Sequence, residues 1–380
     1  MSSNCSTLAG IGPVRHPIDE AKLTAYLKQT VPSIALPVKL LQRKFTYGQS
    51  NPTYYLRDAN TKSYVLRKKP PGTLLSKTAH AVEREYKILK ALQPTNVPTP
   101  KVYSLCEDSN VIGTPFYVRN LASIKVHIEI MEFLNGRVFA DPLLTGLPRE
   151  ERRQCWNSAI KTLVALHSLD PVSIGLLNYG KASEFYPRQL KTLTAISTVQ
   201  AAVKDQDTGR PVGEIPCFKQ MASWFLRNLP EERSTVIHGD FKIDNLVFHP
   251  TESIVIGILD WELSSIGHPL SDLSNLCQPY VLHRAIGGFA GAYLDGVPQL
   301  DEVLELYTRL SCWDPRPLWT FGTAFAHLRL AVICQGIAAR VARKQASGAK
   351  AAVYRKAFPT LGESGWHMIM NGQMAYKPRI

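Results

Sequence analysis

The chain has 380 residues, enough for about two domains, and its shares of apolar residues (45%) and charged residues (20%) are those of ordinary globular proteins. These values exclude disordered, collagen-like and low-complexity classes. There are 44 Lys and Arg against 31 Asp and Glu, and the net charge of +13 favours a polyanionic partner: a nucleic acid, an anionic membrane or a phosphorylated small molecule.

Other features of the sequence weaken two of these partners. The longest apolar runs, such as Ile254 to Leu259, fall far short of the ~18 residues of a membrane-spanning helix, so we expect no membrane partner. Basic residues form no run of five or six and no repeat is visible, so we expect no nucleic acid partner. The seven cysteines are scattered, which is typical of reduced thiols. No secretion signal or strong transit peptide is visible, so we expect a cytoplasmic protein, with a peroxisomal or mitochondrial location as the alternative.

Residues 1–38 are predicted to form a lead segment with one short helix, because apolar residues recur at near-helical spacing from Ile18 to Leu27. A first domain is predicted at residues 39–134. It begins with β-branched or aromatic triplets separated by turn sequences, which predict an antiparallel meander. The triplets are Phe45–Tyr47, Tyr54–Leu56 and Tyr64–Leu66.

A helix from Thr78 to Leu92 and extended segments at Lys101–Leu105 and Phe116–Leu134 complete this small sheet. Residues 135–380 are predicted to form a mainly helical second domain with one β interlude. The interlude consists of short strands at Val236–Ile237, Leu246–Phe248 and Ile254–Leu259. The predicted fold class is therefore α+β and two-lobed, with a small mainly β N-lobe and a larger mainly α C-lobe, the layout of protein-kinase-like phosphotransferases.

The strongest motif is HGDFKIDN at His238–Asn245, followed fifteen residues later by Asp260. Phosphoryl transfer needs a carboxylate to accept the hydroxyl proton and oxygen ligands that hold Mg²⁺ on the phosphates. Asp240 fits the first role, and Asn245 and Asp260 fit the second, since the predicted hairpin brings both to its open end. The alternative is an Asp-rich turn with Asp260 as a helix N-cap. His238 is interpreted as a residue that fixes the loop.

These residues resemble a known family. HGDFKIDN and LDWELSSIGHPLSDL are similar to the aminoglycoside phosphotransferase (APH) and choline kinase superfamily. Segments such as GQSNPTYYL, HAVEREYKILKAL and MEFLNGRVF resemble the kinase-like domain carried by acyl-CoA dehydrogenase family members 10 and 11, over about residues 40–370. The resemblance covers only the phosphotransferase part of those proteins, and it implies ATP and Mg²⁺ as cofactors.

The resemblance implies that the turn YGQSNP lies over the ATP phosphates. In this turn Gly48 would allow close backbone approach, while Gln49, Ser50 and Asn51 would donate to phosphate oxygens. A turn of this composition also occurs in ordinary hairpins. The proposed contact with the phosphates therefore rests on the position of the turn between the first two strands.

Arg67 stands where protein kinases carry a lysine on the third strand, and a guanidinium can bridge phosphate and carboxylate there. Lys68 and Lys69 are the alternatives and are expected to be solvated. By resemblance the partner carboxylate is Glu85 in the first helix, and Glu83 is its competitor.

The adenine hinge is expected at Met131–Leu134, with Met131 and Phe133 among its contacts. Before it, residues 119–130 form an insertion relative to similar proteins. The insertion either elaborates the hinge side or is a translated intron, and its VHIEI segment could replace PFYV in the sheet.

Asp272 resembles a buried aspartate that ties the catalytic loop, and His167 is expected to pack near a helix end. Glu262 either reaches a second metal or is an exposed carboxylate. The candidates for the acceptor pocket are polar residues of the C-lobe. They are Arg188, Arg284, Arg329, Gln335 and Arg340.

The favoured function is an ATP- and Mg²⁺-dependent phosphotransferase for a small molecule with a hydroxyl group, and the resemblance implies a hydroxyacyl-CoA. The basic charge supports an acidic acceptor of that kind. The alternatives are a kinase for an amino-alcohol or aminoglycoside-like acceptor and a catalytically inactive nucleotide-binding pseudokinase.

Overall fold

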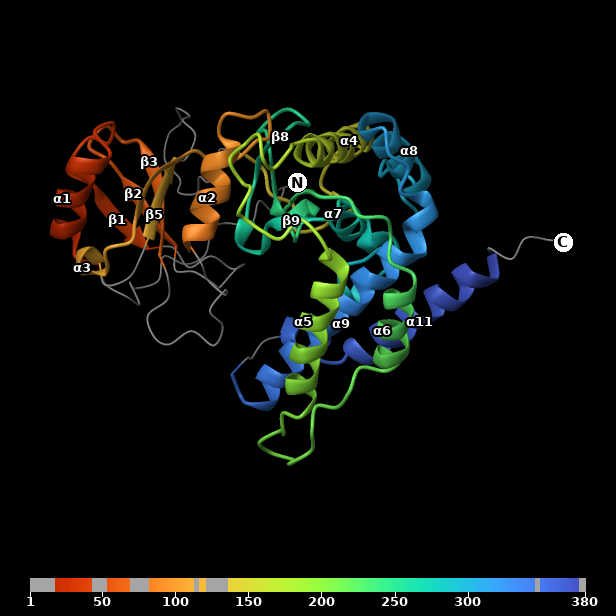
Figure 1. The fold of residues 1–380 in the computed structure, drawn as a ribbon. Coiled ribbons are helices and arrows are strands. Elements are labelled where there is room, and N and C mark those ends of the chain that lie inside the picture. Colours follow the sequence, from red (N-terminus) through yellow and green to blue (C-terminus); the bar gives the residue numbers. More distant parts are fainter. Residues whose placement is uncertain are drawn as a thin grey trace, which may run out of the picture. The chain divides into compact units, whose positions relative to one another are not determined.

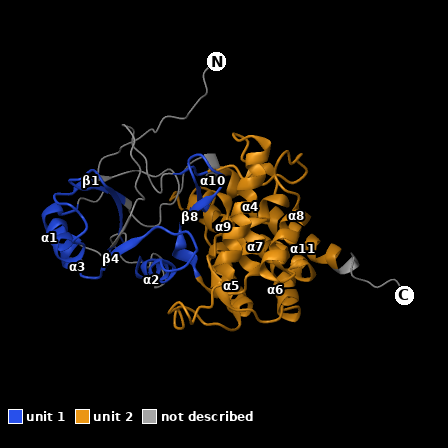
Figure 2. Ribbon diagram, turned by 90° about the horizontal axis from the view of Figure 1, so that it is seen from above, with its two compact units in different colours: residues 1–138, 245–264 blue, residues 139–244, 265–380 orange. Residues whose placement is uncertain are grey.

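The computed structural model describes residues 18–42, 53–68, 82–112, 116–120, 136–345 and 349–375. The chain divides into two compact units, coloured separately in Figure 2. Unit 1 comprises Met1–Val138 and Asn245–Ser264, and unit 2 comprises Phe139–Asp244 and Ser265–Ile380. The segment Asn245–Ser264, which was expected in the second domain, therefore groups with unit 1.

Unit 1 contains a five-stranded antiparallel sheet in the order β1-β2-β3-β5-β4. Its strands are β1 (Lys39–Gln42), β2 (Thr53–Arg57), β3 (Ser63–Lys68), β4 (Val102–Cys106) and β5 (Phe116–Asn120). The strands predicted around Tyr54 and Tyr64 are confirmed, with Tyr54 opposite Leu66. The predicted triplet Phe45–Tyr47 lies outside the described residues, and β1 was not predicted.

Helix α1 (Glu20–Thr30) confirms the predicted N-terminal helix and covers one face of this sheet. Its N-cap is Asp19, whose carboxylate accepts a hydrogen bond from the Lys22 backbone N–H at 3.0 Å. Leu23 and Leu27 are fully buried and pack in one cluster with Tyr54, Leu56, Tyr64 and Leu66. From residue 18 onward, the predicted lead segment is thus part of the core of unit 1.

Helix α2 (Val82–Leu92) lies on the opposite side of the sheet from α1 (Figure 1). Alternation along β3 explains the division: Tyr64 and Leu66 face α1, while Arg67 points to the other face and contacts Glu85 of α2. A short helix, α3 (Ser109–Ile112), connects β4 to β5.

The remaining part of unit 1 is the hairpin of β7 (Leu246–Phe248) and β8 (Val255–Ile258), as predicted. Leu246 pairs with Ile258, and Arg137 adds a β-bridge to Phe248. The Ile258 backbone N–H donates to the Pro98 carbonyl at 3.0 Å. These bonds attach the hairpin to segments that precede it by more than a hundred residues.

Unit 2 is mainly helical, as predicted. Its helices are α4 (Arg149–His167), α5 (Phe185–Ala201), α6 (Phe218–Arg227), α7 (Leu270–Leu276), α8 (Leu300–Ser311), α9 (Trp319–Ala342), α10 (Ala349–Tyr354) and α11 (Phe358–Ala375). Two short strands, β6 (Thr235–Ile237) and β9 (Ser265–Gly267), pair antiparallel. The core is rich in aromatic rings from α5, α6 and α9, and Phe225 packs edge-to-face against both Phe321 and Phe325.

One helical stretch of unit 2, Arg316–Ala342, is long and apolar enough by composition to cross a membrane. Most of it is buried inside the protein, with Phe321, Ala324, Phe325 and Leu328 in the core. Burial of this extent is typical of a central core helix.

Candidate active site

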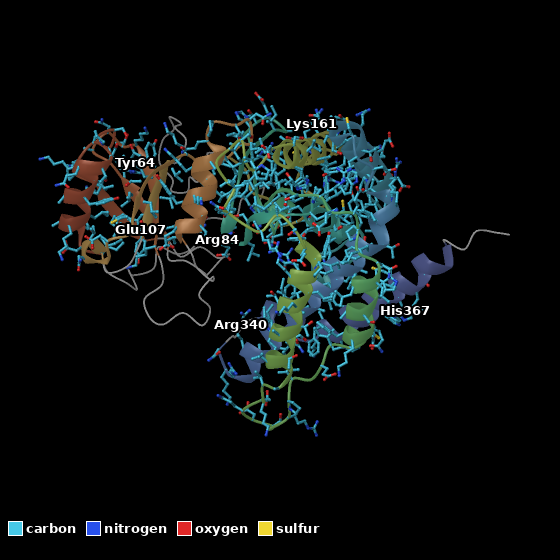
Figure 3. All side chains as sticks on the ribbon, viewed as in Figure 1. Tyr64, Arg84, Glu107, Lys161, Arg340 and His367 are labelled. Carbon is cyan, nitrogen blue, oxygen red and sulfur yellow. The ribbon has the colours of Figure 1, made fainter. Side chains whose placement is uncertain are left out.

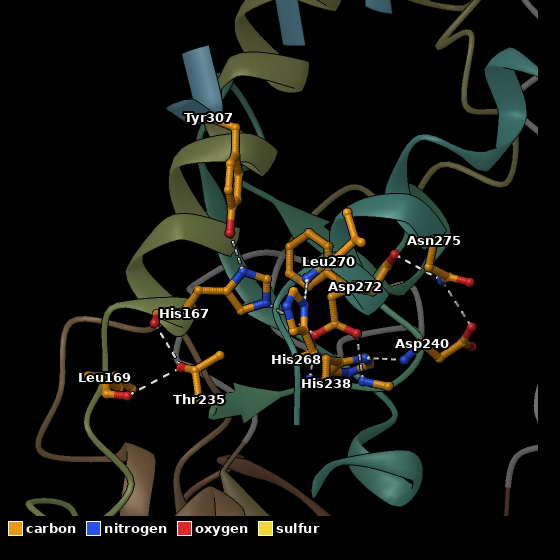
Figure 4. A network of polar contacts seen from close by, with 12 residues as sticks. His167, Leu169, Thr235, His238, Asp240, His268, Leu270, Asp272, Asn275 and Tyr307 are labelled. Atoms are coloured by element: carbon orange, nitrogen blue, oxygen red, sulfur yellow. Dashed lines mark hydrogen bonds and ion pairs between the residues drawn. The ribbon is translucent and has the colours of Figure 1, made fainter. Parts of the chain in front are cut away.

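The HGDFKIDN segment begins where β6 ends, and a buried carboxylate from α7 holds its backbone (Figure 4). Asp272 is fully buried and accepts hydrogen bonds from the backbone N–H groups of His238 (2.6 Å) and Gly239 (2.8 Å). Burial alone would raise the pKa of Asp272, but hydrogen bonding and charge from His167 and His238 hold this pKa below its ordinary value. Asp272 thus ties the loop, as its sequence motif predicted.

Two histidines complete this network. His238 is fully buried, and its Nδ1 accepts a hydrogen bond from the Asp240 backbone N–H at 3.2 Å. His167 lies with Nε2 3.5 Å from the Asp272 carboxylate and Nδ1 2.8 Å from the Tyr307 hydroxyl. The contacts of His238 fit the predicted role in fixing the loop, and His167 has polar contacts in addition to the predicted packing.

Polar groups of unit 2 hold both oxygens of the Asp240 carboxylate. The Asn275 side-chain amide lies 3.4 Å from Oδ1, and Lys242 Nζ lies 3.3 Å from Oδ2 and 3.4 Å from the Asp244 carboxylate. Burial lowers the pKa of Lys242, but the two carboxylates outweigh it and the pKa is raised. Lys242 is therefore a stable cation beside Asp240.

The sequence-based interpretation missed Lys242 and Asn275, although Lys242 belongs to the strongest motif. Arg329, a predicted acceptor-pocket residue on α9, instead donates a hydrogen bond to the Gly239 carbonyl. It therefore holds the loop backbone next to Asp240.

In unit 1, Arg67 pairs with two carboxylates. Its Nη1 lies 2.6 Å from Glu85 Oε1 and 3.4 Å from Asp260 Oδ1. Arg67 and Glu85 are almost completely buried, so the attraction between them is little screened by water. The predicted pairing of Arg67 with Glu85 is confirmed as a contact, and the role of the pair toward ATP stays a prediction.

The prediction for Lys68 was wrong. Its side chain is only 4% exposed and lies over the ring of Tyr54, with Nζ 5.8 Å from the ring centroid. Burial lowers the pKa of this amine. Strand alternation places Lys68 on the opposite face from Arg67, which explains the burial. Lys69 lies outside the described residues.

Asn245 and Asp260 flank the same open end of the β7–β8 hairpin, as predicted. The Leu259 backbone N–H, adjacent to Asp260, donates to the Asn245 carbonyl at 2.8 Å. Asp260 precedes a short 3₁₀ helix, Trp261–Leu263, but its side chain makes no capping hydrogen bond. Asp260 therefore occupies the N-cap position, as the alternative predicted, but its side chain does not cap the helix.

Asn245 and Asp260 are the side chains at this end of the hairpin that would hold a Mg²⁺ ion. One carboxylate and one amide oxygen are hard ligands of the kind that Mg²⁺ prefers. The Asp260 side chain is 45% exposed, and its backbone is left-handed with φ of 60°. Among the described residues, no three His, Cys, Asp or Glu side chains form a group that could hold a metal ion.

Several predicted nucleotide contacts lie outside the described residues: Gly48, Gln49, Ser50, Asn51, Met131 and Phe133. Phe116–Asn120 is described and pairs with both β3 and β4, so PFYV forms the strand as originally predicted. From residue 121 onward, the predicted insertion lies outside the described part.

Two other predicted acceptor-pocket residues have structural contacts. Gln335 is fully buried and hydrogen-bonds the Ser197 side chain and the Gly213 carbonyl. Arg188 donates to the carbonyls of Ser183 and Lys181 just before α5. Arg284 and Arg340 are exposed, and Arg340 lies near the C-terminal end of α9 (Figure 3).

The model of the phosphotransferase enzyme family (APH) matches residues 42–307 of this chain. Acyl-CoA dehydrogenase family member 10 of Mus musculus is 37% identical over 356 residues, covering 92% of this chain and 31% of that protein. Acyl-CoA dehydrogenase family member 11 of Homo sapiens is 37% identical over 383 residues, covering 99% of this chain and 46% of that protein. The chain thus spans less than half the length of these relatives.

Solved structures of the same fold include a Ralstonia eutropha JMP134 protein provisionally described as an aminoglycoside phosphotransferase. It is 33% identical, with a TM-score of 0.79 and coverage of 93% of this chain and 99% of that one. A Plasmodium vivax ethanolamine kinase (15% identical, TM-score 0.58, 91% and 89% coverage) shares the fold. Aminoglycoside phosphotransferase APH(4)-Ia in complex with ADP and hygromycin B also shares it. That protein is 13% identical, with a TM-score of 0.53 and coverage of 91% of this chain and 98% of that one. The predicted two-lobed, protein-kinase-like fold class is confirmed.

Proposed function

Because the chain belongs to the phosphotransferase enzyme family, we propose that it is an ATP- and Mg²⁺-dependent kinase that phosphorylates a hydroxyl group of a small molecule. One observation carries the proposal: the Arg67 guanidinium is shared between Glu85 and Asp260, and Asp260 stands beside Asn245 at one end of a hairpin. A buried cation next to oxygen ligands is the arrangement that nucleotide phosphates and Mg²⁺ need.

In the proposed reaction, Asp240 accepts the proton of the substrate hydroxyl. The hydroxyl oxygen forms a bond to the γ-phosphorus of ATP as the bond from that phosphorus to the ADP oxygen breaks. Asn245 and Asp260 would hold Mg²⁺, which neutralises charge on the phosphates. Lys242, held as a cation beside Asp240, is suited to stabilise the transferred phosphoryl group.

For the acceptor we propose a hydroxyacyl-CoA. Support comes from the names of the similar acyl-CoA dehydrogenase family members and from the net charge of +13, which attracts the phosphates of CoA. A cationic acceptor is the second candidate, because proteins of the same fold include an ethanolamine kinase and an aminoglycoside phosphotransferase bound to hygromycin B.

The test is ATP turnover by the purified protein with three acceptor panels: hydroxyacyl-CoA thioesters, amino alcohols and aminoglycosides. We expect phosphorylation of a hydroxyacyl-CoA and a loss of at least 100-fold in kcat for Asp240→Asn, since general-base catalysis contributes ~10²–10⁴-fold. Asp170→Asn, which alters an exposed turn carboxylate, is the control and should keep full activity. Turnover of the cationic panels alone would overturn the acceptor assignment. Mg²⁺-dependent ATP binding without transfer to any acceptor would identify a pseudokinase.

A further inference from the structure

Asn275 on α7 contacts the Asp240 carboxylate directly. Its side-chain NH₂ group donates to Asp240 Oδ1 at 3.4 Å and to the Phe241 backbone carbonyl at 3.0 Å. We propose that Asn275 is a positioning residue that sets the orientation of the Asp240 carboxylate for proton transfer. The inference rests on the proposed function of Asp240 as the base.

The surrounding contacts make this orientation rigid. Asp272 and Asn275 are three residues apart on α7 and therefore project from the same helix face. Asp272 holds the backbone N–H groups of His238 and Gly239, and Asn275 holds the next two residues of the loop. One face of α7 thus fixes four consecutive residues of the catalytic loop.

The two side chains act on different parts of the loop. Asp272 accepts hydrogen bonds from backbone N–H groups of the loop, so its loss would loosen the whole segment. Asn275 touches the carboxylate itself, so its loss would leave the backbone bonds of Asp272 in place and free the Asp240 side chain to rotate. A variant of Asn275 can therefore test the orientation of the Asp240 carboxylate without disturbing the backbone of the loop.

Asn275 and Lys242 also differ in the constraint that they impose. Lys242 reaches Asp240 Oδ2 through a flexible four-carbon chain and shares its charge with Asp244. The amide of Asn275 is short, partly buried and fixed by its second bond to Phe241. As a neutral donor, it orients the carboxylate without competing for the substrate proton.

The experiment compares the full-length wild type with Asn275→Leu, which removes the donor at similar volume, and Asn275→Asp, which replaces it with a negative acceptor. Gln278→Leu is the matched control, because Gln278 is a buried amide that donates to the Ala326 carbonyl away from the loop. We expect kcat for phosphate transfer from ATP to fall ~10–100-fold in Asn275→Leu and further in Asn275→Asp, since small misplacements of a catalytic group cost up to ~10²-fold. The KM for ATP should stay within about twofold, and Gln278→Leu should retain kcat.

A second readout does not depend on activity. Crystal structures of the wild type and Asn275→Leu should show one orientation of the Asp240 carboxylate in the first and a rotated or divided one in the second. An unchanged kcat or an unchanged carboxylate in Asn275→Leu would overturn the inference, as would an equal fall of kcat in Gln278→Leu. If the wild type transfers no phosphate, the proposed function fails and the pair of crystal structures alone decides the role of Asn275.

Discussion

The Arg67 guanidinium contacts two carboxylates, those of Glu85 and Asp260, at unequal distances. Its Nη1 is 2.6 Å from Glu85 and 3.4 Å from Asp260. The guanidinium is thus held more closely by Glu85 than by Asp260. Asp260 is therefore left able to bind Mg²⁺ in the proposed reaction, and Glu85 affects the metal indirectly.

Removing the Glu85 charge should release Arg67 toward Asp260. We expect Glu85→Gln to raise the Mg²⁺ concentration for half-maximal activity by about tenfold at saturating ATP, which corresponds to ~1.4 kcal/mol. A Mg²⁺ titration of initial rates measures the effect. Glu83→Gln, which alters a carboxylate two residues before Glu85 in the same helix, should leave this concentration unchanged. An equal shift in both variants would show that Glu85 has no special link to Asp260.

At the residue scale, strand alternation and the resemblance to kinase-like phosphotransferases together predicted one contact. Alternation placed Arg67 on one face of its strand, and the resemblance supplied Glu85 as its partner. The contacts of Asn275 could not be predicted, because they depend on how a helix packs against a loop more than thirty residues away in sequence. Lys68 was expected to be solvated because its side chain is charged. Its position on the buried face of the sheet determines its burial instead.

At the scale of elements, the junction between β9 and α7 contains a buried histidine. The side chain of His268 is 2% exposed, its Nδ1 accepts from the Leu270 backbone N–H, and its ring packs near Tyr186 and Trp313. Burial lowers its pKa from 6.5 to about 4. The folded protein thus keeps this imidazole neutral at a pH where the unfolded chain protonates it.

This difference makes the stability of the protein pH-dependent. Between pH 6.5 and about 4 the unfolded chain binds more protons at His268, so the free energy of unfolding should fall as the pH falls. We expect a loss of ~2 kcal/mol from pH 7 to pH 5, at 1.36 kcal/mol per pH unit, in urea unfolding. His268→Asn keeps an acceptor for Leu270 and should remove most of this loss.

The control for this prediction is His283→Asn. His283 is exposed and makes the same kind of bond, with Nδ1 accepting from the Ala285 backbone N–H. Its replacement should leave the pH dependence of unfolding as in the wild type. A His268→Asn protein that loses as much stability as the wild type would contradict the assignment.

Most elements could be predicted from the sequence, but their partners could not. The β7–β8 hairpin corresponds to two short apolar runs around the turn sequence HPTES, and α1 to apolar residues at near-helical spacing. The strand β1 has the short sequence KLLQ, which has no alternation long enough to predict a strand. That α1 covers the sheet follows from packing with Tyr54 and Tyr64, which no local pattern encodes.

At the scale of the whole molecule, chain order and spatial grouping differ. The segment Asn245–Ser264 lies between two stretches of unit 2 in sequence but belongs to unit 1. Its hydrogen bonds to Pro98 and Arg137 explain the grouping. A division of the sequence into consecutive domains takes no account of such long-range bonds. The predicted boundary near residue 134 therefore marks only one of the places where the chain passes between the units.

The net charge also acts on the whole molecule. If the acceptor is a hydroxyacyl-CoA, its KM should rise several-fold between about 50 and 300 mM NaCl, because salt screens long-range attraction to the +13 protein. The value of kcat should change little. Measuring both constants across the salt series checks this expectation, and a KM independent of salt would remove the charge argument for an acidic acceptor.

At Asp260, the residue that best suits the left-handed backbone differs from the residue that could bind a metal ion. With φ of 60°, this position suits glycine, and among the other residues mainly Asn and Asp adopt such a left-handed backbone. Laboratory evolution for heat resistance alone would therefore favour glycine at position 260. The resulting protein would be more robust and would have lost the carboxylate proposed to hold the metal, so such a selection needs a simultaneous screen for activity.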